Sequence, residues 1–208
     1  MCGRYVITNS VKKTKNYVKS AIQVDDFENY NAHPSQELPV IKKYKNGNTL
    51  EKLNWGIIPG WAKKKDFKAL INARLETIDE KISFKKLIKN FRCVVVADGF
   101  YEWKRKEKEK IPYYFTREDK KTIFFAGIYL NDDFCLITEQ ASENIKEVHH
   151  RQPVILHSTD VNNYLKLEIF GSKFLNECKK PKLVFHEISK AVNNPINNTS
   201  SLIQNLNK

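Results

Sequence analysis

An uninterrupted apolar run, Cys93-Val94-Val95-Val96-Ala97, limits the folds open to this chain more than any other stretch. Its length and its β-branched residues are typical of a fully buried strand, which we place over Arg92–Ala97. Three later segments, 112–116, 122–130 and 134–138, have strand character and are separated by polar turns. We interpret them as consecutive antiparallel strands. The chain is therefore predicted to build its core around a sheet.

Weaker patterns indicate further strands and loops. Strands are expected from the start of the chain over 4–8, near its end over 183–188, and in a hairpin of 39–45 and 49–55 joined through Asn46-Gly47. Loops are expected over 27–36 and over the charge run 104–110, and an irregular Asn-rich tail from about residue 191.

Five short helices are expected between these strands. Ser10 is the predicted cap of the first, and Thr77-x-x-Glu80 resembles a capping box that opens the second. The helices are placed over 11–21, 77–88, 142–148, 161–167 and 172–178. Because no repeat and no Gly-, Pro- or Ser-rich linker interrupts the pattern, residues 1–208 are predicted to form a single α+β domain.

The charge of the chain favours a polyanionic partner. Lys and Arg number 36 against 24 Asp and Glu, a formal net charge of +12. Nucleic acid comes first among such partners and an anionic membrane second, although a Lys- and Asn-rich composition can also reflect an AT-rich genome. No apolar run approaches the ~18–20 residues of a membrane span, and no signal peptide is recognised ahead of Cys2. We expect a protein of the cytosol, or of the nucleus if its source is eukaryotic, that does not enter the membrane.

The four cysteines argue against a cysteine-based framework. Cys2, Cys93, Cys135 and Cys178 are far apart and form no Cys-x-x-Cys pair, so neither a disulfide framework nor a zinc site is expected. Cys93 and Cys135 occur in apolar runs and are predicted to be inert core thiols. No metal and no cofactor is expected.

Cys2 is different because of its position. Once Met1 is removed, its α-amine and thiol lie on adjacent carbons, and both groups titrate near neutral pH. Such an aminothiol condenses with an aldehyde to an imine, and its thiol then closes a thiazolidine ring. The alternative is that Cys2 belongs to a disordered chain start. The strand expected directly after it favours an ordered position.

Two polar positions in apolar surroundings are candidates for proton transfer. Glu102 follows Phe100-Tyr101 and precedes Trp103, where desolvation should raise its carboxyl pKa. It could instead alternate outward to solvent. His149 and His150 precede Arg151, and histidine transfers protons at physiological pH, although it is more often a structural hydrogen-bonding residue.

Other candidates point to ligand binding. Asn72 and Arg74 could present an amide and a guanidinium to a ligand, or cap local backbone. Trp61 and Trp103 could stack on nucleobases, an interaction worth roughly 1–3 kcal/mol per base. Tryptophans are more often core residues, which is our prediction for Trp55.

Together these segments resemble the SRAP family, the SOS-response-associated peptidase-like proteins. The resemblance is carried by five blocks in the family's order: Met1-Cys2-Gly3-Arg4-Tyr5, Trp55-Gly56-Ile57-Ile58-Pro59, Asn72-Ala73-Arg74-x-Glu76-Thr77, Ala97-Asp98-Gly99-Phe100-Tyr101-Glu102-Trp103 and His149-x-Arg151-x-Pro153-Val154. Ala191-Val192-Asn193-Asn194-Pro195 is similar to the closing block.

The resemblance implies a fold and an activity. The fold is one α+β domain with a barrel-like sheet and a positive groove for single-stranded DNA. The activity is binding of abasic sites, whose open-chain sugar is an aldehyde, with formation of a thiazolidine crosslink that protects the lesion. A protein that covers one lesion is expected to act as a monomer.

The resemblance also assigns roles by position. Cys2 is the nucleophile, Asn72 hydrogen-bonds its amine or the sugar, and Glu102 shuttles protons. His149 assists as acid or base, and is chosen over His150 because the motif places the histidine two residues before Arg151. The implied DNA contacts are Arg4, Arg74 and Arg151 for phosphates, with Trp61 and Trp103 stacking or wedging beside the lesion.

Three positions depart from the family pattern: Gln152 replaces the usual Met, His33 the usual Ala and Gly60 a common Ser. Gln152 and His33 are expected to affect groove packing or base preference. Two other functions stay open. Cys2 with glutamate, histidine and asparagine would also suit a thiol peptidase or autoprotease of the N-terminal-nucleophile type. The chain could also be a non-covalent nucleic-acid-binding module in which Cys2 is incidental.

Overall fold

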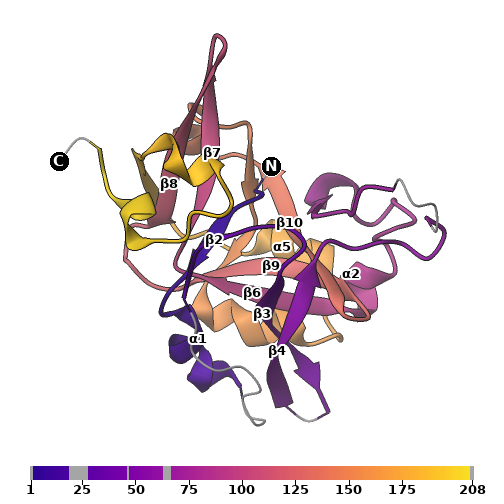
Figure 1. Cartoon of the computed structure of the whole chain (residues 1–208). Coiled ribbons are helices and arrows are strands. Elements are labelled where there is room, and N and C mark those ends of the chain that lie inside the picture. The colour runs from indigo at the N-terminus through magenta and orange to yellow at the C-terminus, as the bar shows by residue number, and fades with distance from the viewer. Residues whose placement is uncertain (1, 19–27, 46, 63–66, 207–208) are drawn as a thin grey trace.

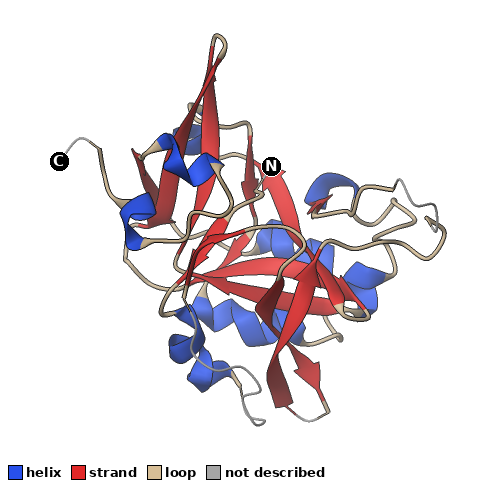
Figure 2. Cartoon of the chain, in the orientation of Figure 1, coloured by secondary structure: helices blue, strands red, loops and turns tan. Residues whose placement is uncertain are grey.

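The computed structural model describes residues 2–18, 28–45, 47–62 and 67–206. Its strands form two sheets (Figure 1, Figure 2). The smaller sheet is antiparallel and has the order β13-β8-β7-β1-β2. Its strands are β1 (Tyr5–Ile7), β2 (Asn29–Ala32), β7 (Gly99–Lys106), β8 (Glu109–Arg117) and β13 (Leu183–Glu187).

The larger sheet closes on itself. Its strands run in the order β11-β10-β4-β3-β6-β9-β12, β5 pairs with β10, and a further pairing of β9 with β10 completes a ring. Only β4 and β5 run parallel to β10 among the described pairings. The expected barrel-like, mainly antiparallel sheet is confirmed. Its strands are β3 (Glu37–Tyr44), β4 (Gly47–Trp55), β5 (Asn72–Arg74), β6 (Arg92–Ala97), β9 (Ile123–Leu130), β10 (Asp133–Gln140), β11 (Arg151–Pro153) and β12 (Ile155–Leu156).

The main core is one cluster of buried side chains that contains residues of both sheets and of the helices. All six residues of β6 are buried, as its apolar run predicts. Tyr5 of the smaller sheet packs on Trp55 and Phe125 of the larger one, with ring centroids 5.0 and 5.8 Å away. The two sheets and the short helices therefore form the predicted α+β domain.

The helices are short and flank the sheets. They are α1 (Ser10–Lys13), α2 (Leu87–Asn90), α3 (Glu143–Lys146), α4 (Val161–Leu165) and α5 (Gly171–Glu177), with 3₁₀ turns η1 (Thr14–Tyr17), η2 (Leu75–Thr77), η3 (Ser158–Asp160), η4 (Lys190–Asn193) and η5 (Ser200–Ile203). The helices expected over 142–148, 161–167 and 172–178 are confirmed. None of the helices in the described ranges is long and apolar enough to cross a membrane.

Two helix predictions need correction. The first helix is a single α-turn followed by η1; its N-cap is Asn9 rather than Ser10, and residues 19–21 of the prediction lie outside the described residues. The helix expected over 77–88 is a series of turns that becomes α2 only at Leu87. A regular helix would bury Ile82 beside Ile78, but Ile82 is 75% exposed while Ile78 is fully buried. Packing against the sheet outweighs the local capping signal.

Three expectations for the strands and loops are also wrong. Asn29–Ala32 is a strand beside β1, although its Asn-rich sequence has low strand propensity. The charge run 104–110 continues β7 and β8 as a paired ribbon, which lacks an apolar alternation because most of its residues are exposed. The segment 112–116 belongs to β8 in the smaller sheet and does not pair with β9.

The tail from residue 191 contains no strand or α-helix in its described part, as expected, yet it packs against the smaller sheet. Val192 and Leu202 are buried against Val6 and Tyr101. Asn31 of β2 donates from Nδ2 to three tail carbonyl oxygens. The tail therefore packs against β1, the strand that follows Cys2, and hydrogen-bonds to β2, which pairs with β1.

Gly99→Ala should destabilise the fold by about 1–3 kcal/mol through overpacking. Gly99 begins β7, and an added Cβ would lie 2.3 Å from the buried ring of Tyr114. The denaturation midpoint would fall. Gly60→Ala is the matched control, because a Cβ at Gly60 meets nothing within 4 Å. Equal midpoints for the two variants would mean that Tyr114 moves aside without cost.

Candidate active site

Four predicted catalytic residues come together where the two sheets meet. The β1–β7 register, with Tyr5 opposite Phe100, brings the start of the chain alongside Glu102. Asn72 begins β5 and His149 lies two residues before β11, and both of these strands pair with β10. Asn72 Nδ2 donates to the Cys2 carbonyl oxygen at 2.9 Å, and His149 Nδ1 lies 3.9 Å from Glu102 Oε1.

Cys2 is fully buried, and its Sγ lies 3.9 Å from the Arg4 carbonyl oxygen. Burial raises the pKa of the Cys2 thiol, and the negative charge of Glu102 raises it further. The thiol is therefore neutral at physiological pH. A neutral thiol is a weak nucleophile, because the reactive form of cysteine is the thiolate.

Glu102 is only 2% exposed. Desolvation raises the pKa of its carboxyl group to about 7. The sequence-based expectation of a raised pKa agrees with this environment, and the alternative in which Glu102 points to solvent is wrong. A carboxyl group with this pKa is present in both protonation states near neutral pH, so it can give and take protons.

His149 is oriented by the backbone of Arg151. Its Nδ1 lies 2.9 Å from the Arg151 carbonyl oxygen and 3.1 Å from the Arg151 amide nitrogen. Burial lowers the pKa of His149, so the imidazole is neutral near pH 7. The ring of His150 lies 4.5 Å from that of His149 but is exposed. His149 is the one directed toward Glu102, as the motif predicts.

Asn72 presents an acceptor that the described residues do not use. Its Oδ1 is buried and has no hydrogen-bond partner among them. A buried amide oxygen without a partner is costly, so it suits a site where a donor arrives with the ligand. An amine or a sugar hydroxyl would provide that donor.

The three arginines predicted to bind phosphate differ in their surroundings. Arg4 donates to Asn31 Oδ1 and to the Val192 carbonyl oxygen at 2.6 and 2.8 Å. Arg151 is buried and pairs through both terminal nitrogens with Glu76, at 2.6 and 3.0 Å. Arg74 is exposed, and no described residue hydrogen-bonds to its guanidinium group. Arg74 is therefore the arginine most available to a ligand.

The two candidate stacking tryptophans also differ. Trp61 is 63% exposed and meets Phe67 edge-on, with ring centroids 5.3 Å apart. Trp103 is half-buried and donates from Nε1 to Asn193 Oδ1 at 2.7 Å. Trp55 is a core residue, as predicted.

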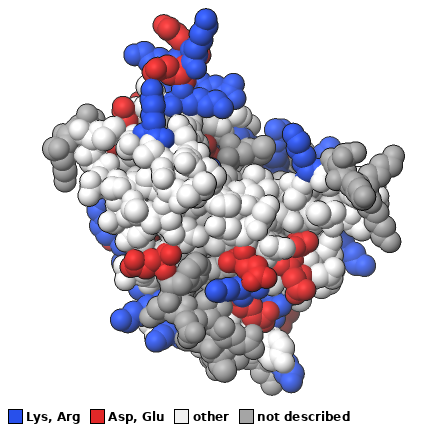
Figure 3. Space-filling view, in the orientation of Figure 1, with Lys and Arg blue, Asp and Glu red and all other residues white. Residues whose placement is uncertain are grey.

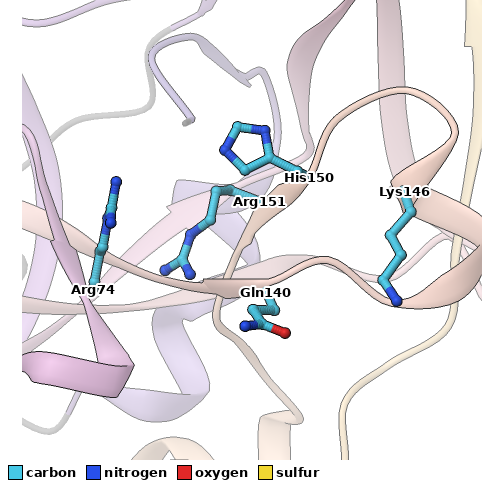
Figure 4. A pocket seen from close by; sticks show the side chains of 5 residues that line it. All are labelled: Arg74, Gln140, Lys146, His150 and Arg151. Carbon is cyan, nitrogen blue, oxygen red and sulfur yellow. The ribbon is translucent and has the colours of Figure 1, made fainter.

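Two adjoining hollows, each of about 530 Å³, lie beside the candidate catalytic residues, and His149 lines one of them. Figure 4 shows the first hollow: Arg74 and Lys146 stand on opposite sides, with His150 and Arg151 between them. The second hollow shares Lys146 and His150 with the first. Its other lining residues include Trp103, Lys104, Arg105 and His149.

Sequence reasoning did not single out Lys104, Arg105 and Lys146 as site residues. The sequence predicts an exposed loop for Lys104 and Arg105 and a short helix for Lys146. The available signal was their nearness in sequence to Glu102 and His149, but the ribbon that presents them was not predicted. Among the described residues, no group of three or more His, Cys, Asp or Glu side chains is placed to hold a metal ion.

The departures from the family pattern are accommodated locally. Gln152 is buried, accepts from Ser142 N and donates to Glu139 Oε1, so it ties the segment that carries His149 to β10. His33 Nδ1 lies 2.8 Å from the Pro34 carbonyl oxygen. Open space surrounds Gly60.

The chain is similar to known proteins in both sequence and fold. The family model described as SOS response associated peptidase (SRAP) matches residues 1–195. The chain is 32% identical over 226 residues to the abasic site processing protein YoqW of Bacillus subtilis (strain 168), covering 98% of this chain and 99% of that protein. It is 28% identical over 229 residues to the abasic site processing protein YedK of Escherichia coli (strain K12), with the same coverage of each chain. The fold matches a crystal structure of a Bacteroides thetaiotaomicron protein with a TM-score of 0.81, at 22% identity, over 98% of this chain and 99% of that one.

Proposed function

Because this chain belongs to the SOS response associated peptidase (SRAP) family, we propose that it processes abasic sites, binding single-stranded DNA and capturing the lesion covalently through Cys2. The relatives are abasic site processing proteins, which supports the lesion as the target. The observation that carries the chemistry is the convergence of Cys2, Asn72, Glu102 and His149 at one point.

The reaction begins when removal of Met1 frees the α-amine of Cys2. This amine adds to the aldehyde carbon of the ring-opened sugar, and loss of water gives an imine. The thiol then adds to the imine carbon and closes a thiazolidine ring. A neutral, buried thiol suits this order, because the amine attacks first and the thiol follows within the same site.

Glu102 and His149 transfer the protons in this scheme. Protonated Glu102 assists opening of the sugar ring and departure of water, and its carboxylate accepts the proton that the thiol releases. His149, neutral near pH 7, acts as acid or base beside the sugar. Asn72 accepts a hydrogen bond from the amine or the sugar through Oδ1.

Arg74 is the leading phosphate contact in the proposed complex, and Trp61 and Trp103 are proposed to stack on bases beside the lesion. Arg4 and Arg151 act with them by holding the site in place and by their positive charge. We propose a monomer that acts in the cytosol, without a metal or a cofactor.

An oligonucleotide with one abasic site tests this proposal. Protein with a free amino end should give a shifted band that survives denaturation, whereas protein that keeps a tag ahead of Cys2 should give none. Turnover of peptides without such a band would favour the thiol peptidase. Binding of DNA without the band would favour a non-covalent module and exclude the covalent proposal.

Arg74→Ala should weaken binding to undamaged single-stranded DNA and flatten its salt dependence. Loss of one phosphate contact lowers the slope of log K against log salt by about 0.7 for a single strand. Fluorescence anisotropy between low and moderate salt measures this slope. Lys173→Ala removes one charge from α5, outside both hollows, and is the control. An unchanged slope for Arg74→Ala would exclude Arg74 as a phosphate contact.

A further inference from the structure

The outer ends of β7 and β8 form a ribbon that projects beyond the smaller sheet (Figure 1). In the described residues β1 pairs with β7 at Gly99 and Phe100, and the adjoining Arg4 carbonyl oxygen accepts from Tyr101 N. The ribbon, residues 103–112, extends past that neighbour. Residues 104–110 contain five Lys and Arg and two Glu. Figure 3 shows basic side chains gathered on the projecting end, with acidic ones among them. One of those, Glu109, pairs with Lys190 at 3.3 Å.

The base of the ribbon faces the catalytic cluster. Lys104 and Arg105 line the second hollow together with His149. Burial lowers the pKa of His149, and the nearby charges of Arg105 and Arg151 lower it further. One carboxylate, that of Glu147, lines the same hollow. The cations at the base of the ribbon therefore lie close to the histidine that we place beside the sugar.

The basic groups follow one another across the site. Arg74 and Lys146 border opposite sides of the first hollow, with His150 between them (Figure 4). Lys146 also borders the second hollow, where Lys104 and Arg105 follow. Basic side chains therefore lie on both sides of His149 and His150. A polynucleotide strand that crosses the catalytic cluster would meet a cation before and after the lesion.

We propose that the base of the β7–β8 ribbon is a second DNA-binding surface, which contacts backbone phosphates on the side of the lesion opposite Arg74. Lys104 and Arg105 are its main contacts, and Lys146 lies between the two surfaces. This inference rests on the proposed function and extends it to the path of the strand. Lysine and arginine neutralise phosphates regardless of sequence, so the surface positions the strand without reading its bases.

The test uses a stable analogue of the abasic site, a tetrahydrofuran nucleotide, which lacks the aldehyde and so reports binding without crosslinking. The analogue is placed at the 5′ end, the middle or the 3′ end of a short single strand, so that the end-placed lesions have a flank on one side only. Lys104→Gln with Arg105→Gln should weaken binding about tenfold for the central lesion and for one end-placed lesion, leaving the other unchanged. Arg74→Ala should affect the opposite end-placed lesion.

Lys106→Gln with Lys108→Gln is the matched control, because it removes the same charge from exposed positions on the ribbon that line neither hollow. For the central lesion, the salt slope of the Lys104/Arg105 variant should fall by about 1.4, two single-strand contacts, and that of the control by less. Lys146→Gln, on α3, should weaken binding of both end-placed lesions, and provides a readout independent of ribbon folding.

Equal losses in the ribbon variant and its control would overturn the inference, because the effect would then be general attraction. The same flank preference for Arg74→Ala and the ribbon variant would also overturn it. Neither result touches the covalent chemistry, which the crosslinking assay measures separately. Failure of the wild-type protein to bind any of these strands would instead remove the proposed function itself.

Discussion

Cys2→Ala is expected to abolish the denaturation-resistant band that the wild-type protein forms with an abasic oligonucleotide. The variant keeps an α-amine, so it can still form an imine, but it lacks the sulfur that closes the ring. An imine hydrolyses under denaturing conditions. The band should therefore fall below detection without a reductant. Adding borohydride, which reduces an imine to a stable amine, should restore a band and show that the amine reacts first.

Cys178→Ala is the matched control for this experiment. Cys178 is the partly exposed member of the three other cysteines, lies just after α5 and contacts Lys180, remote in sequence from every catalytic candidate. Its loss should leave the band unchanged. A band that survives Cys2→Ala without a reductant would move the linkage to another nucleophile, and the proposed role of the aminothiol would be wrong.

Much of the fold is predictable because hydrophobic patterning agrees with the final packing. The apolar run of β6 and the hairpin of β3 and β4 are examples. The turn predicted at Asn46-Gly47 differs, because Gly47 already pairs with Tyr44 as the first residue of β4, and Asn46 lies outside the described residues. The errors occur where tertiary contacts decide. Asn29–Ala32 becomes a strand because β1 and the tail engage it, and 77–88 does not form one helix because packing leaves Ile82 in solvent. Local propensity carries no information about such contacts.

The sequence identifies the candidate catalytic residues and the raised pKa of Glu102, but not which of the arginines are engaged. Motif positions bring Cys2, Asn72, Glu102 and His149 into the candidate set, and the structure brings them together. The sequence does not show that Arg4 and Arg151 are engaged by protein acceptors while Arg74 is exposed. The ribbon also cannot be predicted from the sequence. A charged two-stranded extension has no buried face, so its residues do not alternate between apolar and polar.

Glu102→Gln is expected to slow crosslinking by about 10²–10⁴-fold, the usual contribution of a positioned general acid or base. The crosslinking rate of the wild-type protein should show an inflection at a pH of about 7, where Glu102 titrates. The glutamine variant should lose this inflection, because an amide has no proton to exchange. Single-turnover rates between pH 5.5 and 8.5 measure both effects. An unchanged rate and an unchanged pH profile would exclude Glu102 from proton transfer.

The same substitution should make the protein more stable at alkaline pH. Burial raises the folded-state pKa of Glu102 from 4.5 to about 7, so folding favours the protonated form. The protonated carboxyl group of Glu102 therefore contributes to the free energy of unfolding below pH 4.5. This contribution, on the order of 3 kcal/mol, is lost as the pH rises through 7. The amide side chain of the variant remains neutral at every pH. The thermal midpoint of Glu102→Gln should therefore exceed that of the wild type by about 5–10 °C at pH 8, and the two should converge below pH 5.

Glu118→Gln is the control for the stability measurement, because Glu118 is exposed and pairs only with Lys182 at the surface among the described residues. Its effect should stay below about 1 kcal/mol at either pH. If Glu102→Gln proved less stable than the wild type at pH 8, the carboxylate would be stabilising the folded state. A more stable but slower variant would instead mean that this site retains a buried acid at the expense of folding stability, because a carboxyl group with a pKa near 7 suits the proposed proton transfer.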